Sequence, residues 1–111
     1  MRRREPPQSQ QSPAHPASDS LARARKAKKH GDLRGEITAL RHASRIDEYD
    51  PILFTLLGAA LMRAGKPDEA IQALKHALWL RERAQDHLRA AVVRRLISCA
   101  IRGLTIGSKA A

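Results

Sequence analysis

At 111 residues the chain is long enough for one small domain, and its single Phe, Trp and Tyr beside abundant Ala, Leu and Arg favour helices over sheets. The formal net charge of +10 is concentrated at the ends, because residues 1–31 carry +6 and residues 81–111 carry +5, while residues 32–80 carry −1. One cysteine, Cys99, excludes an intramolecular disulfide, and no run approaches the length of an apolar membrane span, so we expect a cytoplasmic protein without membrane insertion.

Residues 1–17 are rich in Pro, Gln and Ser behind a basic tip. This composition cannot bury enough apolar surface to offset the entropy lost on ordering, so we expect a disordered tail. The tip resembles the positive end of an export signal, but no apolar segment follows it. Four prolines also prevent the amphipathic helix of a mitochondrial transit peptide.

Two helices are expected next. Ser18, Asp19 and Ser20 offer capping side chains to a helix that runs to about His30, although its apolar edge is narrow. Gly31 and Asp32 then end this helix and cap the next one, which extends to about Asp47. Its apolar residues recur at spacings of three and four, a pattern typical of an amphipathic helix: Leu33, Ile37, Leu40, Ala43 and Ile46.

Residues 51–80 form the clearest element, a helical hairpin with its turn at Gly65-Lys66-Pro67. Asp50 can cap the first helix, and Pro51 suits its first position, because the amide that proline lacks would have no intrahelical partner there. Gly65 favours the left-handed conformation that ends many helices, and Pro67 begins the second helix.

Residues 81–86 leave two alternatives open, because they contain neither Gly nor Pro and all tolerate a helix. Either the chain turns at 82–86 with Asp86 as the cap of a fifth helix, or one long helix runs from 67 to about 102. We expect the last helix to span about 86–103, to end at Gly103 and to be followed by a flexible tail over 105–111. Its wide apolar stripe could cover the last hairpin, or could dock a partner or a second copy of the chain. The stripe consists of Leu88, Val92, Val93, Leu96, Ile97, Ala100, Ile101 and Leu104.

The chain also contains an internal repeat. At an offset of 34 residues, 31–46 and 65–80 share six identities in sixteen positions, where roughly one is expected by chance at average amino-acid usage. The identical positions in the first copy are Gly31, Ile37, Ala39, Leu40, His42 and Ala43. The first copy departs from the second at Glu36, which lies opposite Ala70, as degenerate terminal repeats often do.

The second copy resembles the tetratricopeptide repeat. The similarity rests on two small residues that let the two helices approach closely, Gly58 and Ala70. The residues that fill the seam between the helices are Phe54, Leu57, Leu61, Leu74 and Ala77. The resemblance implies an all-α fold of antiparallel helical hairpins, stacked as a short solenoid. Its repeats would span about 17–50 and 51–84, with a terminal capping helix, in a domain of residues 18–104.

Residues that could support catalysis or bind a cofactor are not grouped in the sequence. No two of the five histidines are spaced for a zinc site, so we expect His42 and His76 on the surface. The serines lack a nucleophile turn, no phosphate-binding glycine loop is present, and Cys99 lies where we expect packing. The acids Asp47, Glu48 and Asp50 lack the glycine and later acid of a calcium loop. We therefore expect a non-enzymatic protein without metal or cofactor.

The family resemblance implies a protein-binding groove lined by the first helix of each hairpin. Its residues here would be Arg25, Lys28, Lys29, Ile52, Thr55, Ala59, Met62 and Arg63, beside Leu21. This partly apolar, partly basic surface suits an acidic or amphipathic segment of another protein. The chain has no Asn, so the resemblance does not extend to the subset that clamps a chaperone's C-terminal carboxylate. We expect Arg63→Glu to weaken partner binding without unfolding the domain.

Two other modes of association fit the sequence. The basic ends could bind nucleic acid without sequence preference, using a surface of Arg89, Arg94, Arg95 and Arg102 on the last helix. Aromatic residues for base stacking are scarce, so we keep nucleic-acid binding as the alternative and protein binding as the main expectation. The apolar stripe of the last helix could instead complete a homodimer.

Overall fold

The computed structural model describes residues 17–110, and the side chains of residues 17–104. These residues form five α-helices and no strand, so the expectation of an all-α fold is confirmed. The helices are α2 (Ser18–Lys29), α3 (Leu33–Ile46), α4 (Pro51–Arg63), α5 (Pro67–Arg83) and α6 (His87–Ala110). No helix within this part of the chain combines the length and apolar character needed to cross a membrane. The tail predicted for 1–17 lies outside the described residues, except for Ala17, which is buried.

Most helix starts follow the local signals in the sequence. The Asp32 carboxylate accepts a hydrogen bond from the Gly35 amide at 2.9 Å, and Asp50 accepts one from the Ile52 amide at 2.9 Å. Prolines occupy the first turns of α4 and α5, as predicted. The start of α2 differs, because Ala17 is its N-cap and no side chain caps it. Ala17 packs with Ala43 and Leu53, so tertiary contact replaces the expected serine cap.

Three helices end in the same turn. After α2, α4 and α5, one backbone N–H donates to the carbonyl oxygen five residues earlier. The N–H of the residue just before it donates to the carbonyl oxygen three residues before that residue, and together these are the two hydrogen bonds of a Schellman motif. The left-handed residue is glycine in the first two turns, with φ +74° at both Gly31 and Gly65. In the third turn it is Gln85, with φ 58°. Of the two alternatives for residues 81–86, the structure therefore has the turn.

Gln85→Gly is expected to stabilise the fold by about 0.5–1 kcal/mol. The left-handed conformation costs a residue with a Cβ roughly 1–2 kcal/mol, and glycine avoids this cost. Part of the stabilisation is lost because glycine also raises the conformational entropy of the unfolded chain. Thermal unfolding followed by circular dichroism would show a melting temperature higher by a few degrees. Gly65→Ala is the matched control and should lower the melting temperature. A Cβ at Gly65 would meet no atom within 4 Å, so its cost is conformational. A lower melting temperature for Gln85→Gly would contradict the expectation.

Helix α6 is longer than predicted. It continues through Gly103 to Ala110, so the expected end at Gly103 is wrong, and residues 105–110 of the expected tail belong to the helix. A glycine inside a helix costs about 1 kcal/mol relative to alanine, but it does not stop the helix when no left-handed turn follows. Residue 111 lies outside the described part.

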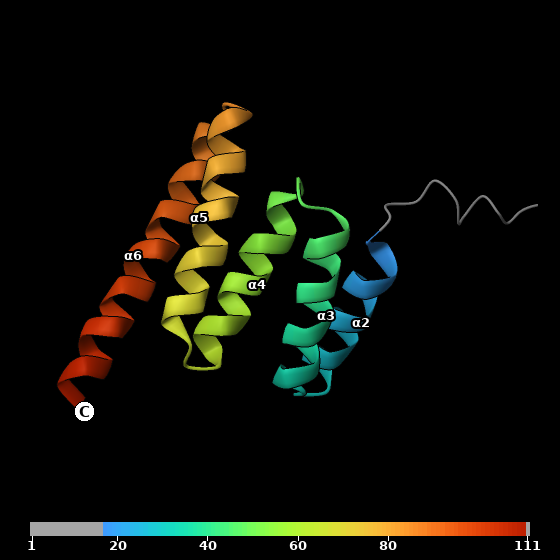
Figure 1. Ribbon diagram of the computed structural model, residues 1–111, viewed down its shortest axis with the longest axis horizontal. Coiled ribbons are helices and arrows are strands. Elements are labelled where there is room, and N and C mark those ends of the chain that lie inside the picture. Colours follow the sequence, from blue (N-terminus) through green and yellow to red (C-terminus); the bar gives the residue numbers. More distant parts are fainter. Residues whose placement is uncertain (1–16, 111) are drawn as a thin grey trace, which may run out of the picture.

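Each helix packs on the next along the chain, and Figure 1 shows α2 and α3 at one end of the elongated molecule and α5 and α6 at the other. Helices α4 and α5 of the second hairpin pack closely at Gly58, where a Cβ would lie 2.6 Å from Leu74 Cγ. The predicted seam residues Leu57, Leu61, Leu74 and Ala77 are all buried. Phe54 is the exception, because it is half-buried and its ring contacts His76.

The junction between α3 and α4 is the least extensive contact between consecutive helices. Side-chain ion pairs reinforce it. Arg63 donates two hydrogen bonds to the Glu36 carboxylate, at 3.0 and 2.7 Å, and Arg41 pairs with Glu69 on α5. The Glu36 side chain is only 6% exposed. The residue that departs from the repeat pattern therefore joins the two hairpins.

Candidate functional site

A hollow of about 260 Å³ lies between α4 and α6. Its apolar lining comes from both helices: Ile52, Thr55 and Leu56 on α4, with Val92 and Val93 on α6. We call this set, with the neighbouring Arg81 and Arg89, the α4–α6 groove. Two of the predicted groove residues, Ile52 and Thr55, belong to it. Val92 and Val93 belong to the apolar stripe predicted for the last helix, but the sequence alone does not show which part of that stripe α5 covers.

Two arginines and one carboxylate form the polar side of the α4–α6 groove. Asp86 Oδ2 accepts hydrogen bonds from Arg81 at 3.3 Å and from Arg89 at 3.1 Å. The backbone N–H of Arg89 also donates to Asp86 and, with the Arg89 and Arg81 charges, lowers the pKa of Asp86 from its ordinary value. Two guanidinium groups share one carboxylate, which leaves a net positive charge beside the apolar lining. Arg81 Nε is buried and has no hydrogen-bond partner among the described residues.

The remaining predicted groove residues do not join this site. Ala59 is half-buried, and Met62 packs against the core. Arg25, Lys28 and Lys29 line a separate open hollow on α2, of about 590 Å³, together with Lys26. The single continuous groove expected from the sequence is therefore divided into an α2 surface and the α4–α6 groove.

Arg63 has a structural role that the sequence analysis missed. Its side chain is 44% exposed, but its guanidinium is held by Glu36 through two hydrogen bonds that raise the pKa of Arg63 above its ordinary value. The structure changes what we expect of Arg63→Glu, because the new carboxylate would lie beside that of Glu36 and would weaken the fold. The signal in the sequence was Glu36 itself, at a position where the second repeat has Ala70.

The predicted basic surface of α6 is partly neutralised. Arg89 pairs with Asp86, and Arg94 pairs with Glu82 at 2.9 Å. Arg102 donates to Cys99 Sγ at 3.2 Å, and Cys99 is half-buried. Arg95 is exposed and forms no ion pair within the described residues. This surface offers fewer free cations to an anionic partner than its sequence suggests.

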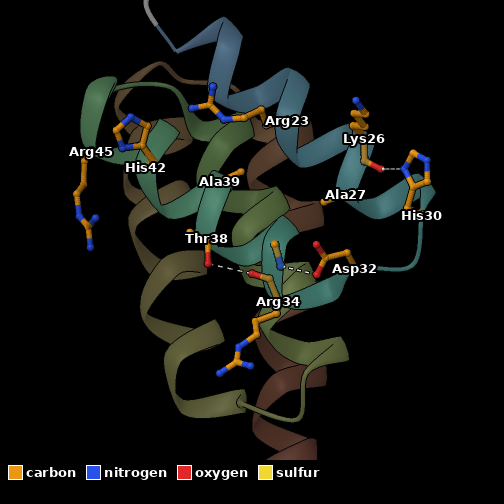
Figure 2. A pocket seen from close by; sticks show the side chains of 11 residues that line it. Arg23, Lys26, Ala27, His30, Asp32, Arg34, Thr38, Ala39, His42 and Arg45 are labelled. Carbon is orange, nitrogen blue, oxygen red and sulfur yellow. Dashed lines mark hydrogen bonds between the residues drawn. The ribbon is translucent and has the colours of Figure 1, made fainter.

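A larger basic hollow, of about 1100 Å³, lies between α2 and α3 (Figure 2). We call it the α2–α3 end face. Its cationic side chains are Arg23 and Lys26 on α2 and Arg34 and Arg45 on α3, around the small residues Ala27, Gly35 and Ala39. None of its lining residues was expected from the sequence to form a binding site. The repeat alignment held the signal, because Arg23 and Lys26 lie opposite the apolar Leu57 and Ala60.

His76, which was predicted to lie on the surface, is half-buried and contacts neighbouring residues. Its ring lies 4.2 Å from that of Phe54 and 5.7 Å from that of Trp79, and its Nε2 lies 3.0 Å from the Glu48 carbonyl oxygen. Arg83 stacks over Trp79 at 4.7 Å. These contacts attach the connection between α3 and α4 to α5. His42, at the equivalent position, is exposed as predicted.

Part of the apolar stripe on α6 remains uncovered. Val93 and Ala100 are buried against the rest of the fold, while Leu88, Val92 and Ile101 are exposed. Within the described side chains, no group of three His, Cys, Asp or Glu residues is arranged to hold a metal ion. Comparison of the chain with protein-family models, curated proteins and solved structures finds no match.

Proposed function

We propose that this protein is a small non-catalytic protein-interaction module made of two tetratricopeptide-like repeats, α2–α3 and α4–α5, with α6 as the terminal helix. The support is the agreement between sequence period and helix geometry. The starts of α3 and α5 differ by the 34 residues of the sequence repeat, as do the ends of α2 and α4. Gly31 and Gly65, also 34 residues apart, have the same φ of +74°. Helical repeats of this kind commonly bind other proteins on an extended surface.

The observation that carries the binding proposal is the α4–α6 groove. Ile52 is 49% exposed and Val92 is 57% exposed, and both line the same hollow from different helices. Exposed apolar residues are common as isolated side chains, but a pair that shares a hollow offers apolar area to one ligand. Arg81 and Arg89 lie beside this pair. The groove therefore suits a peptide segment with an apolar residue next to a carboxylate.

A binding experiment with two matched variants tests this function. Val92→Glu places a charge in the groove, whereas Ile101→Glu makes the same change on the opposite side of α6, at a residue of similar exposure, 50%. Each full-length protein would be used for affinity co-purification from its native host, with and without nuclease and at low and high salt. We expect a retained protein that resists both treatments, is lost with Val92→Glu and persists with Ile101→Glu.

Other outcomes would contradict the proposal. Retention of the same protein by Val92→Glu would exclude the α4–α6 groove as its site. If all retained material disappears with nuclease, the partner is nucleic acid, and if it disappears only with high salt, binding follows the basic ends of the chain. Ile101→Glu alone could lose binding, and size-exclusion chromatography could show that this variant also loses a dimer. In that case the side of α6 that carries Ile101 joins two copies of the chain instead.

A further inference from the structure

The α2–α3 end face and the matching face of the second hairpin have the same register and different chemistry. At an offset of 34 residues, Leu57, Ala60 and Trp79 on the second hairpin correspond to Arg23, Lys26 and Arg45 on the first. Leu57 and Ala60 are buried in the core cluster that α3 shares with α4 and α5. Their counterparts on the first hairpin are exposed. The positions of this face that are apolar and buried in the second repeat, Leu57 and Ala60, are therefore cationic in the first.

The second hairpin shows that this face accommodates a helix. Helix α3 packs against α4, and it reaches α5 through the ion pair between Arg41 and Glu69. It also supplies Glu36, which receives Arg63 from the end of α4. The residue at the Arg63 position of the first hairpin is Lys29, which is again a cation. The first hairpin thus repeats the cation that accepts a carboxylate from a neighbouring helix.

A polar end face alone would be expected, because a terminal repeat must remain soluble. That requirement does not explain why one sign of charge dominates. Lys26, Arg34 and Arg45 form no ion pair within the described residues, and Arg23 donates to the Ser20 hydroxyl at 3.2 Å. The one carboxylate in the lining, Asp32, is occupied in capping α3. The cations are therefore available to an external anion.

We propose that the α2–α3 end face docks an acidic amphipathic helix of another protein, in the position that α3 takes on the second hairpin. Small side chains of that helix would face Ala27 and Ala39, which lie between the cations in Figure 2. Its carboxylates would meet the surrounding cations: Arg23, Lys26, Arg34 and Arg45. This site lies on different helices from the α4–α6 groove, so the module would hold two partner segments at once.

A protein helix fits this face better than nucleic acid does. The lining contains no Phe, Tyr or Trp on which a base could stack, and its only rings are the small imidazoles of His30 and His42. Its floor of small residues matches the close approach of another helix, which the sugar–phosphate backbone does not require. The described chain has no acidic helix to offer, since each of its helices carries at least as many Lys and Arg residues as Asp and Glu residues. The occupant is therefore another protein, not a second copy.

The probe is a synthetic fluorescent peptide of about four helical turns, with Ala and Leu on one face and Glu on both flanks. Fluorescence anisotropy would measure its Kd for the full-length protein and for Arg34→Glu/Arg45→Glu. The matched control is Arg95→Glu/Arg102→Glu, which changes the net charge equally on α6, and circular dichroism would verify that both variants fold. We expect the α3 variant to raise the Kd on the order of tenfold or more and the α6 variant to leave it nearly unchanged.

Three results would overturn the proposal. The first is an equal loss of binding by the two double variants, which would show attraction to net charge alone. The second is unchanged binding of a peptide with the same Glu residues but with prolines in place of some alanines, because the ligand would then not need to be a helix. The third is tighter binding of duplex or single-stranded DNA that depends on Arg34 and Arg45. Val92→Glu separates the two sites, since it should bind this peptide like the wild type whether or not the α4–α6 groove has a ligand.

Discussion

Gly58→Leu is expected to lower the free energy of unfolding by about 1–3 kcal/mol, the usual cost of overpacking a core. A Cβ at this position would lie 2.6 Å from both Cγ and Cδ2 of Leu74 and 3.4 Å from the Ala70 carbonyl oxygen. Leu74 is fully buried, so it has no solvent-exposed space into which it can move. The two helices of the second hairpin would have to separate to admit the new side chain.

Chemical denaturation followed by circular dichroism measures this effect, and Gly103→Leu provides the control. A Cβ at Gly103 would meet its nearest neighbour, Pro67 Cβ, at an ordinary 3.8 Å. The same Gly-to-Leu change should there be neutral or stabilising, because leucine favours a helix more than glycine does. Equal stability of Gly58→Leu and the wild type would contradict the close packing of α4 on α5.

Arg63→Ala is expected to destabilise the protein by about 1–3 kcal/mol, because it leaves the Glu36 carboxylate buried without its two guanidinium hydrogen bonds. Arg63→Glu should cost more, since a second carboxylate would face the first. The effect should be concentrated at the junction of α3 and α4, where the contact between helices is smallest. Hydrogen exchange would then show the α2–α3 amides losing protection before those of α4–α6.

A double-mutant cycle separates the pair from its surroundings. Removing both charges, with Glu36→Ala and Arg63→Leu, should cost less than the sum of the two single changes, because no buried charge is left unpaired. Alanine is also the residue that the second repeat has at this position, Ala70. Strict additivity of the two single changes would show that the ion pair does not couple the hairpins.

Local signals in the sequence were sufficient for most helix boundaries. Asp50, Pro51, Gly65 and Pro67 each act through backbone geometry or a capping bond within a few residues, so their effects do not depend on the rest of the fold. The turn at Gln85 was harder to predict. It has the hydrogen bonds of the glycine turns but no glycine, and the residue adopts φ 58° within the tertiary structure. Gly103 failed as a helix end for the converse reason, because a glycine alone does not make a turn.

The functional surfaces were less predictable than the helices, because pairing of charges depends on residues far apart in the chain. Arg63 was assigned to the groove, but its partner Glu36 lies 27 residues earlier. On α6, Arg94 is paired with Glu82, twelve residues away on α5. Conversely, Arg34 and Arg45 were not predicted to belong to a binding surface, and they form no ion pair within the described side chains.

The sequence by itself determined the all-α class, the 34-residue period, the caps at Asp32 and Asp50 and the glycine turns, because these depend on short-range sterics and hydrogen bonds. Tertiary structure decided which apolar residues of α6 are covered, that Ile52 and Val92 share one groove, and which cations remain free. Those properties depend on how α3, α5 and α6 lie against their neighbours, since burial and ion pairing arise only when side chains from distant segments meet.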